Sequence, residues 1–304
     1  MRLVVALGGN ALLRRGELPD AEPQRRNVVS AVAALAPLAV AHEVVVTHGN
    51  GPQVGVLAME SATDPMLTRP FPLDHLGAET QGLIGYWLVQ ALRNALPGRQ
   101  VAALITQCVV DADDAAFTHP AKFVGPTYDE LGAHRLAAER NWVVAPDGES
   151  WRRVVASPEP QRVVEAETVR MLTEAGVLVV CAGGGGVPVV ETGAGTLEGV
   201  EAVIDKDLTA ALLAEVLGAD ALLLLTDVSG VETDFGRPGS ELIRHATPAE
   251  LRPCSFPPGS MGPKVDAACR FVERTGGIAA IGSLTQAGAV LAGTAGTRIA
   301  SQPG

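Results

Sequence analysis

The sequence predicts an α/β protein with a three-layer α/β/α architecture, an open and mostly parallel sheet, and a small protruding subdomain. Short apolar, β-branched runs alternate with longer stretches of helical periodicity, which is typical of βαβ units whose parallel strands are covered on both faces. A proline-rich segment near the middle interrupts this alternation. With 304 residues, 47% of them hydrophobic and 19% charged, the chain can bury a full core as one large domain or two lobes.

The alternation places each expected element along the chain. The expected strands are Leu3–Leu7, Val44–Thr47, Val101–Val110, Val177–Ala182, Ala221–Thr226 and Ile278–Ile281. The expected helices are Asn27–Ala41, Leu76–Leu96, Val163–Ala175, Leu208–Leu217 and Lys264–Arg274. Ligands of parallel sheets bind beyond the carboxyl ends of the strands, so the residues that follow each strand are candidates for the functional site.

Residues 111–160 break the periodic pattern with five prolines and the polar stretch Asp111–Asp114. A structureless loop of this length is unusual inside a compact domain. We therefore predict a small functional insert or lid, with a flexible linker between two lobes as the alternative. Arg152 and Arg153 in this segment either hold an anionic group or are solvated surface.

Composition argues against several classes of partner. The net charge of −11 disfavours sequence-independent binding to nucleic acid, which needs a basic face. No apolar run reaches the roughly 18 residues of a membrane-spanning helix. The stretch Leu3–Leu13 contains two glycines, which favours a strand and turn over a signal peptide. We expect a soluble, cytoplasmic protein without nucleic-acid or membrane partners.

No metal site made by the protein itself is predicted. The six histidines lack the HExxH pattern or any other spacing of zinc ligands, and the cysteines form no CxxC pair. In a cytoplasmic protein the cysteines are expected to be reduced thiols in the core. They are Cys108, Cys181, Cys254 and Cys269.

Three expected strands are followed by glycine-rich turns. These turns are Gly8-Gly9-Asn10, Gly49-Asn50-Gly51-Pro52 and Gly183-Gly184-Gly185-Gly186. Glycine exposes backbone N–H groups to an anion without hindrance from a Cβ, so three such turns indicate a phosphate-rich ligand. The standard nucleotide fingerprints are missing, because the second turn reads GxGxxxG and Lys264 is followed by Val265 rather than by Ser or Thr.

Lysine is rare in this chain. Of 23 basic residues, three are lysines: Lys122, Lys206 and Lys264. Because arginine and lysine are largely exchangeable on surfaces, these three are candidates for positions that need a compact ammonium group, with chance as the alternative. Lys206 and Lys264 each begin a helical pattern, where a cation opposes the helix dipole but a bound phosphate is favoured. Lys122 lies in a segment that looks irregular and has no such local argument.

Seven blocks of the sequence resemble carbamate kinases. They follow one another in order along nearly the whole chain. The tetraglycine, the IDKD block and the insert are similar to carbamate kinases in particular, whereas the glycine turns are shared with the wider amino-acid kinase fold. The blocks are 4–12 VVALGGNAL, 47–55 THGNGPQVG, 80–88 TQGLIGYWL, 151–158 WRRVVASP, 181–190 CAGGGGVPVV, 199–207 GVEAVIDKD and 259–264 GSMGPK.

The resemblance implies two lobes. Residues 1–200 would bind carbamoyl phosphate and carry the insert, as a subdomain or lid, at about 112–158, and residues 201–304 would bind the nucleotide. It also implies a cytoplasmic homodimer with a role in arginine metabolism. The expected helix at 76–96 carries more apolar surface than one face needs, so part of it contacts a second copy or simply adds to the core. The residues concerned are Leu83, Tyr86, Trp87 and Leu88.

The resemblance implies direct phosphoryl transfer between carbamoyl phosphate and ADP, with Mg²⁺ bound through the nucleotide phosphates. The lysines of the family fall on Lys122, Lys206 and Lys264, and Lys122 would replace a lysine that related kinases carry at the position of Ala6. Asp207 would orient the lysines, with a role as a helix N-terminal acid as the alternative. The catalytic set implied is Lys122, Lys206, Lys264 and Asp207.

The binding residues follow from the same resemblance. The substrate-binding set is Gly8, Gly9, Asn10, Gly49, Asn50, Gly51, Arg152, Gly183 and Gly184. The nucleotide-binding set is Thr226, Asp227, Val228, Met261, Gly262 and Lys264.

Three rival functions remain open from the sequence. A kinase of the same fold acting on UMP or an acylated amino acid would keep the glycine turns but has no need of Lys122. A non-catalytic nucleotide sensor has no reason to retain all three lysines. A dinucleotide-dependent dehydrogenase is disfavoured by the missing fingerprint.

Overall fold

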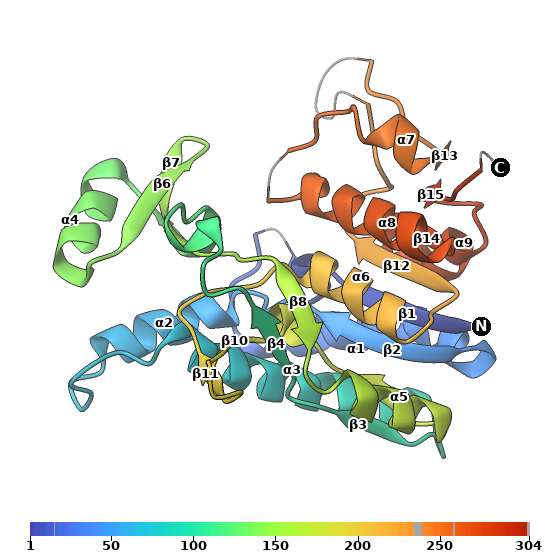
Figure 1. Cartoon of the computed structure of the whole chain (residues 1–304), viewed down its shortest axis with the longest axis horizontal. Helices are drawn as coiled ribbons and strands as arrows, with labels where there is room; N and C mark the ends of the chain where they lie inside the picture. Colours follow the sequence, from blue (N-terminus) through green and yellow to red (C-terminus); the bar gives the residue numbers. More distant parts are fainter. Residues whose placement is uncertain (15, 234–238, 258, 303–304) are drawn as a thin grey trace.

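The computed structural model describes residues 1–14, 16–233, 239–257 and 259–302, and the side chain of Asn10 lies outside the described part. Its centre is a sheet with the strand order β13-β15-β14-β12-β1-β2-β9-β3 (Figure 1). The strands from β14 to β3 pair in parallel, whereas β14 and β15 pair antiparallel. The bounds are β1 Arg2–Leu7, β2 Glu43–His48, β3 Val101–Ala103, β9 Leu178–Val180, β12 Ala221–Thr226, β13 His245–Ala246, β14 Ile278–Ser283 and β15 Thr297–Ile299.

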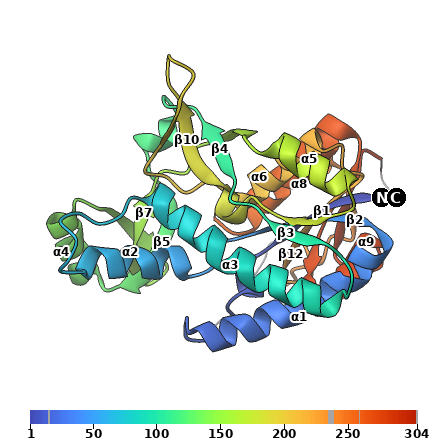
Figure 2. The ribbon, with the colours of Figure 1, turned by 90° about the horizontal axis from the view of Figure 1, so that it is seen from below.

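Helices cover both faces of this sheet (Figure 2). One face carries α1 (Ala21–Ala41), α3 (Leu73–Ala95) and α9 (Ala287–Leu291). The other face carries α5 (Ala166–Glu174), α6 (Lys206–Val216) and α8 (Met261–Thr275). The predicted three-layer α/β/α class with a mostly parallel sheet is therefore confirmed.

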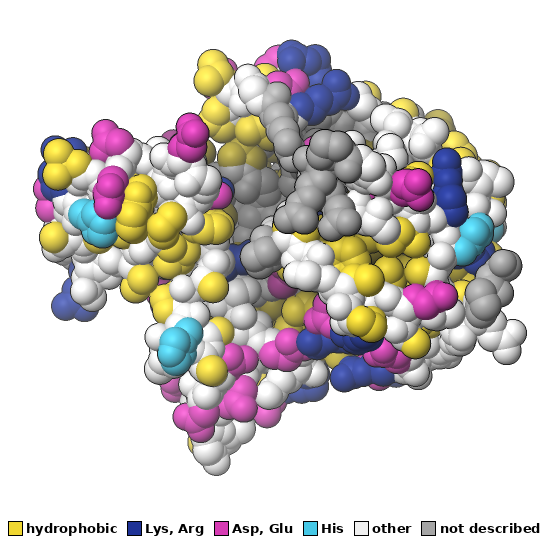
Figure 3. Space-filling model, turned by 90° about the horizontal axis from the view of Figure 1, so that it is seen from above, with side chains coloured by type: hydrophobic (Ala, Val, Ile, Leu, Met, Phe, Trp, Pro, Cys, Tyr) yellow, Lys and Arg dark blue, Asp and Glu magenta, His cyan; other side chains and the backbone are white. Residues whose placement is uncertain are grey.

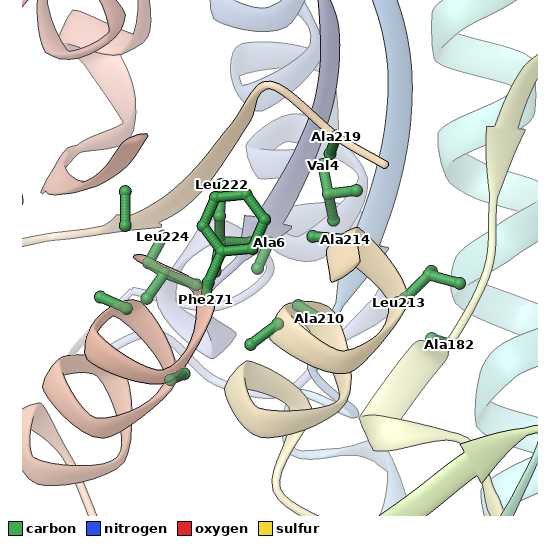
Figure 4. Close-up of a cluster of buried hydrophobic side chains, with 14 of the residues drawn as sticks. Val4, Ala6, Ala182, Ala210, Leu213, Ala214, Ala219, Leu222, Leu224 and Phe271 are labelled. Carbon is green, nitrogen blue, oxygen red and sulfur yellow. The ribbon is translucent and has the colours of Figure 1, made fainter. Parts of the chain in front are cut away.

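Strand β1 shows how the two cores are built. Leu3, Val5 and Leu7 pack in the core under α1 and α3. The alternate residues Val4 and Ala6 pack in the core under α6 and α8, where Figure 4 shows them beside residues of those helices. All five side chains are at most 1% exposed. Because successive side chains of a strand point to opposite faces, a strand buried on both faces reads as a continuous apolar run.

The expected run Val101–Val110 does not form one strand. It divides into β3 and a separate strand β4 (Gln107–Val110), which belongs to a four-stranded sheet of order β11-β10-β4-β8. The break falls where the backbone of Thr106 bonds with the side chain of Gln81, a contact that local periodicity does not reveal. The remaining bounds of this sheet are β8 Pro160–Val163, β10 Val187–Glu191 and β11 Leu197–Gly199.

The helices differ from expectation mainly at their starts. Helix α5 begins at Ala166 rather than Val163, because Val163 pairs with Cys108 at the end of β8. Helix α1 begins six residues earlier than expected, at Ala21. In the described residues four further α-helices were not expected: α2 (Gln53–Thr63), α4 (Glu130–Arg140), the short α7 (Pro248–Leu251) and the short α9 (Ala287–Leu291).

Three of the four cysteines are buried, as expected for core thiols. Burial raises the pKa of the Cys181 thiol to about 12. Cys254 is exposed, so its assignment to the core was wrong. It follows the one-turn helix α7, where the chain runs over the surface toward α8.

The proline-rich segment folds into a separate three-stranded antiparallel sheet of order β5-β7-β6, with one helix. Its elements are β5 Lys122–Tyr128, α4 Glu130–Arg140, β6 Val143–Asp147 and β7 Ser150–Val155. The guanidinium groups of Arg140 and Arg153 lie 5.0 and 4.8 Å from the centre of the Trp142 ring. We call this unit, residues 122–155, the insert. It is folded rather than a flexible linker, and Lys122 begins a strand instead of lying in irregular chain.

The insert touches the rest of the molecule through backbone packing and ion pairs. Helix α2 packs so closely on β5 that a Cβ on Gly55 would lie 2.5 Å from the Cα of Gly125. Arg153 donates to Glu201 at 3.0 Å, and the same carboxylate accepts from the amide of Leu73 at the start of α3. The close approach of the Gly55 and Gly125 backbones therefore helps to fix the insert against the main body.

Replacing Gly55 with alanine tests that contact. We expect Gly55→Ala to lower the free energy of unfolding by about 1–3 kcal/mol, because the new methyl group meets backbone that must move. Gly77→Ala, also inside a helix but with no atom near its Cβ position, should instead raise it by about 0.5–1 kcal/mol. Denaturant unfolding measures both, and equal behaviour of the two variants would contradict the close packing.

Candidate active site

The glycine turns meet at one edge of the main sheet. Because β1, β2 and β12 are adjacent and parallel, their carboxyl ends lie side by side. The amide of Gly8, after β1, donates to the carbonyl oxygen of Leu225 at 2.9 Å, and the amide of Gly49, after β2, donates to that of Leu7 at 3.1 Å. The tetraglycine turn follows β9, which is the neighbour of β2 in the sheet. This is the edge where parallel sheets bind ligands.

Two cavities open at this edge, of about 280 and 520 Å³. Lys122, Lys206, Gly9 and Gly259 line both, so the cavities join at these residues. Figure 3 shows the molecular surface hollowed between the insert and the main body. The smaller cavity is lined further by Gly8, Asp205, Asp207, Thr226, Asp227, Val228, Glu232, Phe256, Pro257, Ser260, Met261 and Lys264. The larger is lined further by Leu13, Gly49, Asn50, Gly51, Pro52, Val54, Phe123, Val124, Arg152, Gly184, Val203 and Ile204.

Two of the three lysines share one carboxylate oxygen. The Nζ of Lys206 lies 2.9 Å and the Nζ of Lys264 lies 2.8 Å from Oδ2 of Asp207. Lys206 is the first residue of α6 and Lys264 lies in the first turn of α8, so both positions at helix N-termini are confirmed. The third lysine, Lys122, reaches from the insert to donate to Oδ2 of Asp205 at 2.6 Å.

Burial and charge compete at this cluster. Burial alone would raise the pKa of Asp207, but Lys206 and Lys264 together hold it below its ordinary value. Burial and the neighbouring charge of Lys206 lower the pKa of Lys264, with Asp207 opposing them. The Asp207 carboxylate therefore stays ionised and orients two ammonium groups that would otherwise repel each other.

Asp205 has two roles in the structure. Its side chain caps α6, with Oδ1 accepting from the amides of Asp207 at 2.9 Å and Leu208 at 3.4 Å. Its other oxygen holds Lys122. Burial opposes ionisation of Asp205 and the nearby charge of Asp207 adds to it, but the charges of Lys122 and Lys206 and the hydrogen bond from Lys122 together outweigh them, so the pKa of this carboxyl group lies below its ordinary value.

Comparison with known proteins agrees with this geometry. Residues 1–281 match the model of the amino acid kinase family. The chain is 52% identical over 305 residues to the carbamate kinase of Rhizobium meliloti, covering 99% of this chain and 94% of that one. It is 50% identical to the carbamate kinase of Haemophilus influenzae, covering 98% and 96%. The chain belongs to the carbamate kinase branch of the amino acid kinase family.

A solved structure of this family has the same architecture. The carbamate kinase from Giardia lamblia bound to AMP-PNP superimposes with a TM-score of 0.88 at 38% identity, covering 98% of each chain. A structure at 15% identity, the isopentenyl phosphate kinase of T. acidophilum, gives a TM-score of 0.59 and shows the fold alone.

The residues predicted for this carbamate kinase site differ in how they reach the cavities. Two predicted residues, Gly183 and Gly262, line neither cavity. Gly183 faces the ring of His48, and the amide of Gly262 donates to the carbonyl oxygen of Pro257. Arg152 lines the larger cavity while donating to Gly125 and Asp147. The side chain of Asn10 lies outside the described residues. The predicted residues that line a cavity are Gly8, Gly9, Gly49, Asn50, Gly51, Lys122, Arg152, Gly184, Lys206, Asp207, Thr226, Asp227, Val228, Met261 and Lys264.

Sequence reasoning missed several apolar members of the site. Phe256 lines the smaller cavity, and Phe123 and Ile204 line the larger. Ile204 stands directly before Asp205 in the IDKD block, and Phe256 lies just before the GSMGPK block, so proximity to a motif was the available signal. Phe123 carried no signal of its own, because its segment was expected to be irregular.

His48 is buried at the end of β2, beneath the site. Its Nδ1 donates to the carbonyl oxygen of Gly49 at 2.8 Å, which leaves Nε2 without a proton in the neutral ring. Burial lowers the pKa of His48 to about 4 from 6.5, and the bond to Gly49 only partly opposes this. The ring is therefore neutral at pH 7.

The low pKa of His48 makes stability depend on pH. Between pH 6.5 and 4 the unfolded chain takes up a proton at this histidine while the folded chain does not. The free energy of unfolding therefore decreases by up to about 3 kcal/mol as the pH is lowered through this range. We expect His48→Gln to lose less of its free energy of unfolding than the wild type between pH 7 and 4. Exposed His245→Gln should follow the wild-type curve. Parallel curves for all three proteins in denaturant titrations would contradict this.

Proposed function

We propose that this chain transfers a phosphoryl group reversibly between carbamoyl phosphate and ADP, giving ATP and carbamate, which breaks down to ammonia and CO₂. The observation that carries this proposal is the pair of lysines at the junction of the two cavities. A group passing from one cavity to the other must pass Lys122 and Lys206. Such transfer needs positioning and charge neutralisation more than covalent chemistry, and fixed ammonium groups supply both.

The lining of the cavities supports a division of the substrates. The smaller cavity combines the cation Lys264 with the apolar side chains of Val228, Phe256 and Met261, which suits a nucleotide with its phosphates and base. The larger cavity is lined by the glycine turns, Asn50 and Arg152, which suit a small anion such as carbamoyl phosphate. The N-terminal lobe, residues 1–200, would then bind carbamoyl phosphate and residues 201–304 the nucleotide.

In this mechanism each lysine acts on a different side of the transferred group. Lys122 holds the phosphoryl group from the carbamoyl side, and Lys264 holds the nucleotide phosphates from α8. Lys206 lies between them and neutralises the negative charge of the phosphoryl group during transfer. Asp207 keeps Lys206 and Lys264 in place. Ala6 is buried in β1 and supplies no cation, so the insert provides it through Lys122.

Mg²⁺ fits this site as an ion carried by the nucleotide. In the described residues no three His, Cys, Asp or Glu side chains gather as metal ligands. Asp205 and Asp207 are paired with lysines. Mg²⁺ commonly binds through phosphates and water, and when bound it would neutralise charge on the nucleotide phosphates.

The resemblance and the composition support further proposals about context. We infer a cytoplasmic enzyme of arginine metabolism that acts as a homodimer on small molecules and binds neither nucleic acid nor membranes. Among the described helices, none has the length and apolar character needed to span a bilayer.

Formation of ATP tests the reaction directly. The wild-type chain mixed with carbamoyl phosphate, ADP and Mg²⁺ should form ATP. Lys206→Ala should reduce turnover by on the order of 10²-fold or more, the scale of losing one transition-state donor. Wild-type ATP formation no higher than that of Lys206→Ala would exclude the proposed reaction. Phosphorylation of UMP or an acylated amino acid instead would favour the alternative kinases.

Separate roles for Lys122 and Lys264 predict different effects on nucleotide binding. Lys122→Ala should abolish transfer but bind ADP like the wild type, because this lysine, although it lies at the junction of the two cavities, holds the transferred group from the carbamoyl side. Lys264→Ala should weaken ADP binding by roughly tenfold or more, the loss of one charge-assisted hydrogen bond. Calorimetric titration measures both affinities, with thermal unfolding as the control for folding. Equal loss of ADP affinity in the two variants would show that Lys122 contributes to nucleotide binding and would contradict the separate roles.

The exposed side of α3 predicts the dimer. Trp87 and Leu88 are buried in the core, whereas Leu83 and Tyr86 are 38% and 54% exposed. We expect sedimentation of the wild type at micromolar concentration to show a dimer, and Leu83→Asp to shift it toward monomer by placing a charge in the interface. Leu131→Asp, on the exposed face of the insert, is the matched control and should remain dimeric. A monomeric wild type would contradict the proposal.

A further inference from the structure

A buried polar network lies behind the larger cavity. The side-chain amide of Gln81, on α3, pairs with the backbone of Thr106 in both directions. The amide of Thr106 donates to Oε1 at 2.9 Å, and Nε2 donates to the carbonyl oxygen of Thr106 at 3.0 Å. Gln81 is 3% exposed and Thr106 is fully buried. Neither residue lines either of the two cavities of the candidate site, so neither is placed to touch a substrate there.

The hydroxyl group of Thr106 connects this pair to the tetraglycine turn. Its Oγ1 donates to Oε1 of Gln81 at 3.1 Å and accepts from the amide of Ala182 at 2.7 Å. Ala182 has a left-handed backbone with φ of 49°, a conformation that costs energy for a residue with a Cβ. It starts the turn that continues through the buried glycines 183–186. A strained residue therefore begins the turn, and the Thr106 hydroxyl binds its amide.

The tetraglycine turn confines the side chain of Asn50, a residue of the larger cavity. A Cβ on Gly184 would overlap the side-chain amide of Asn50, and a Cβ on Gly183 would overlap the His48 ring. Oδ1 of Asn50 also accepts from the hydroxyl of Thr80, the neighbour of Gln81 on α3, at 3.0 Å. Asn50 and Gly184 both line the larger cavity. A shift of the turn would open space beside the side-chain amide of Asn50, which the turn otherwise confines.

We propose that Thr106, held by Gln81, is a positioning residue for carbamoyl phosphate. It fixes the Ala182–Gly186 turn, and through the turn the side chain of Asn50, in the geometry that the larger cavity needs. This inference rests on the proposed function and adds to it a residue outside the cavity. Helix α3 sets the shape of the carbamoyl phosphate site from behind, without contacting the nucleotide cavity.

The test compares two variants of Thr106 in steady-state formation of ATP. Thr106→Val keeps the shape and removes the hydroxyl, so the Ala182 amide loses its acceptor. We expect the KM for carbamoyl phosphate to rise by about tenfold or more with a fall in kcat, because small misplacements of a reacting group cost up to about 10²-fold. The KM for ADP should stay within about twofold of the wild type, since Thr106 is remote from that cavity. Thr106→Ser restores the hydroxyl and should restore the KM.

Thr173→Val is the matched control for loss of a buried hydroxyl group. Thr173 is 2% exposed and donates to the carbonyl of Val169 within α5, away from both cavities. It should lose stability without a change in either KM. A second measurement is independent of turnover: hydrogen exchange at the Ala182 amide should be slow in the wild type and faster in Thr106→Val and Gln81→Glu.

The outcomes separate this inference from the proposed function. A wild-type KM for carbamoyl phosphate in Thr106→Val, or an equal rise in the KM for ADP, would overturn the positioning role. The same rise in Thr173→Val would also overturn it. If the wild-type chain forms no ATP, the proposed function fails instead, and exchange at the Ala182 amide then decides whether Thr106 fixes the turn. Unchanged exchange in Thr106→Val would show that it does not.

Discussion

The site depends on one buried carboxylate, that of Asp207. Two ammonium groups in the same small volume would repel each other, and burial of either one alone is costly. Asp207 makes the arrangement stable by accepting from both Lys206 and Lys264 with a single oxygen atom. With Lys122 and Asp205 included, these five side chains carry a net charge of +1. The cluster is thus pre-arranged to receive an anion rather than neutralised in advance.

The topology of the sheet explains why these groups meet. Residues far apart in the chain come together because β1, β2 and β12 are parallel neighbours whose carboxyl ends share one edge. Helices α6 and α8 point their N-terminal turns at that edge, so the lysines there stand beside backbone N–H groups that also attract phosphate. The helix dipole disfavours a lysine in an empty site, but it would favour the phosphate that we propose the lysine binds.

Features with a local cause were predictable from the sequence. The continuous apolar strands predicted the sheet, and the glycine turns and the scarcity of lysine pointed to the phosphate-binding edge and to three catalytic candidates. The break after β3 was not predictable, because it depends on Gln81, which is distant in sequence from Thr106. Lys122 was assigned to irregular chain because strand β5 pairs within a small sheet whose prolines and polar residues hide the strand pattern.

The side chain of Asp205 links the insert to α6. Asp205 caps α6 with one oxygen and holds Lys122 of the insert with the other. If Lys122 leaves Asp205 to follow a phosphoryl group, the cap of α6 remains in place, because the two oxygens serve different partners. Lys206, the first residue of the helix, can therefore keep its position beside Asp207 while Lys122 moves. Under the proposed function, this division would let Lys122 on the insert respond to the substrate without disturbing the lysines that the main body holds.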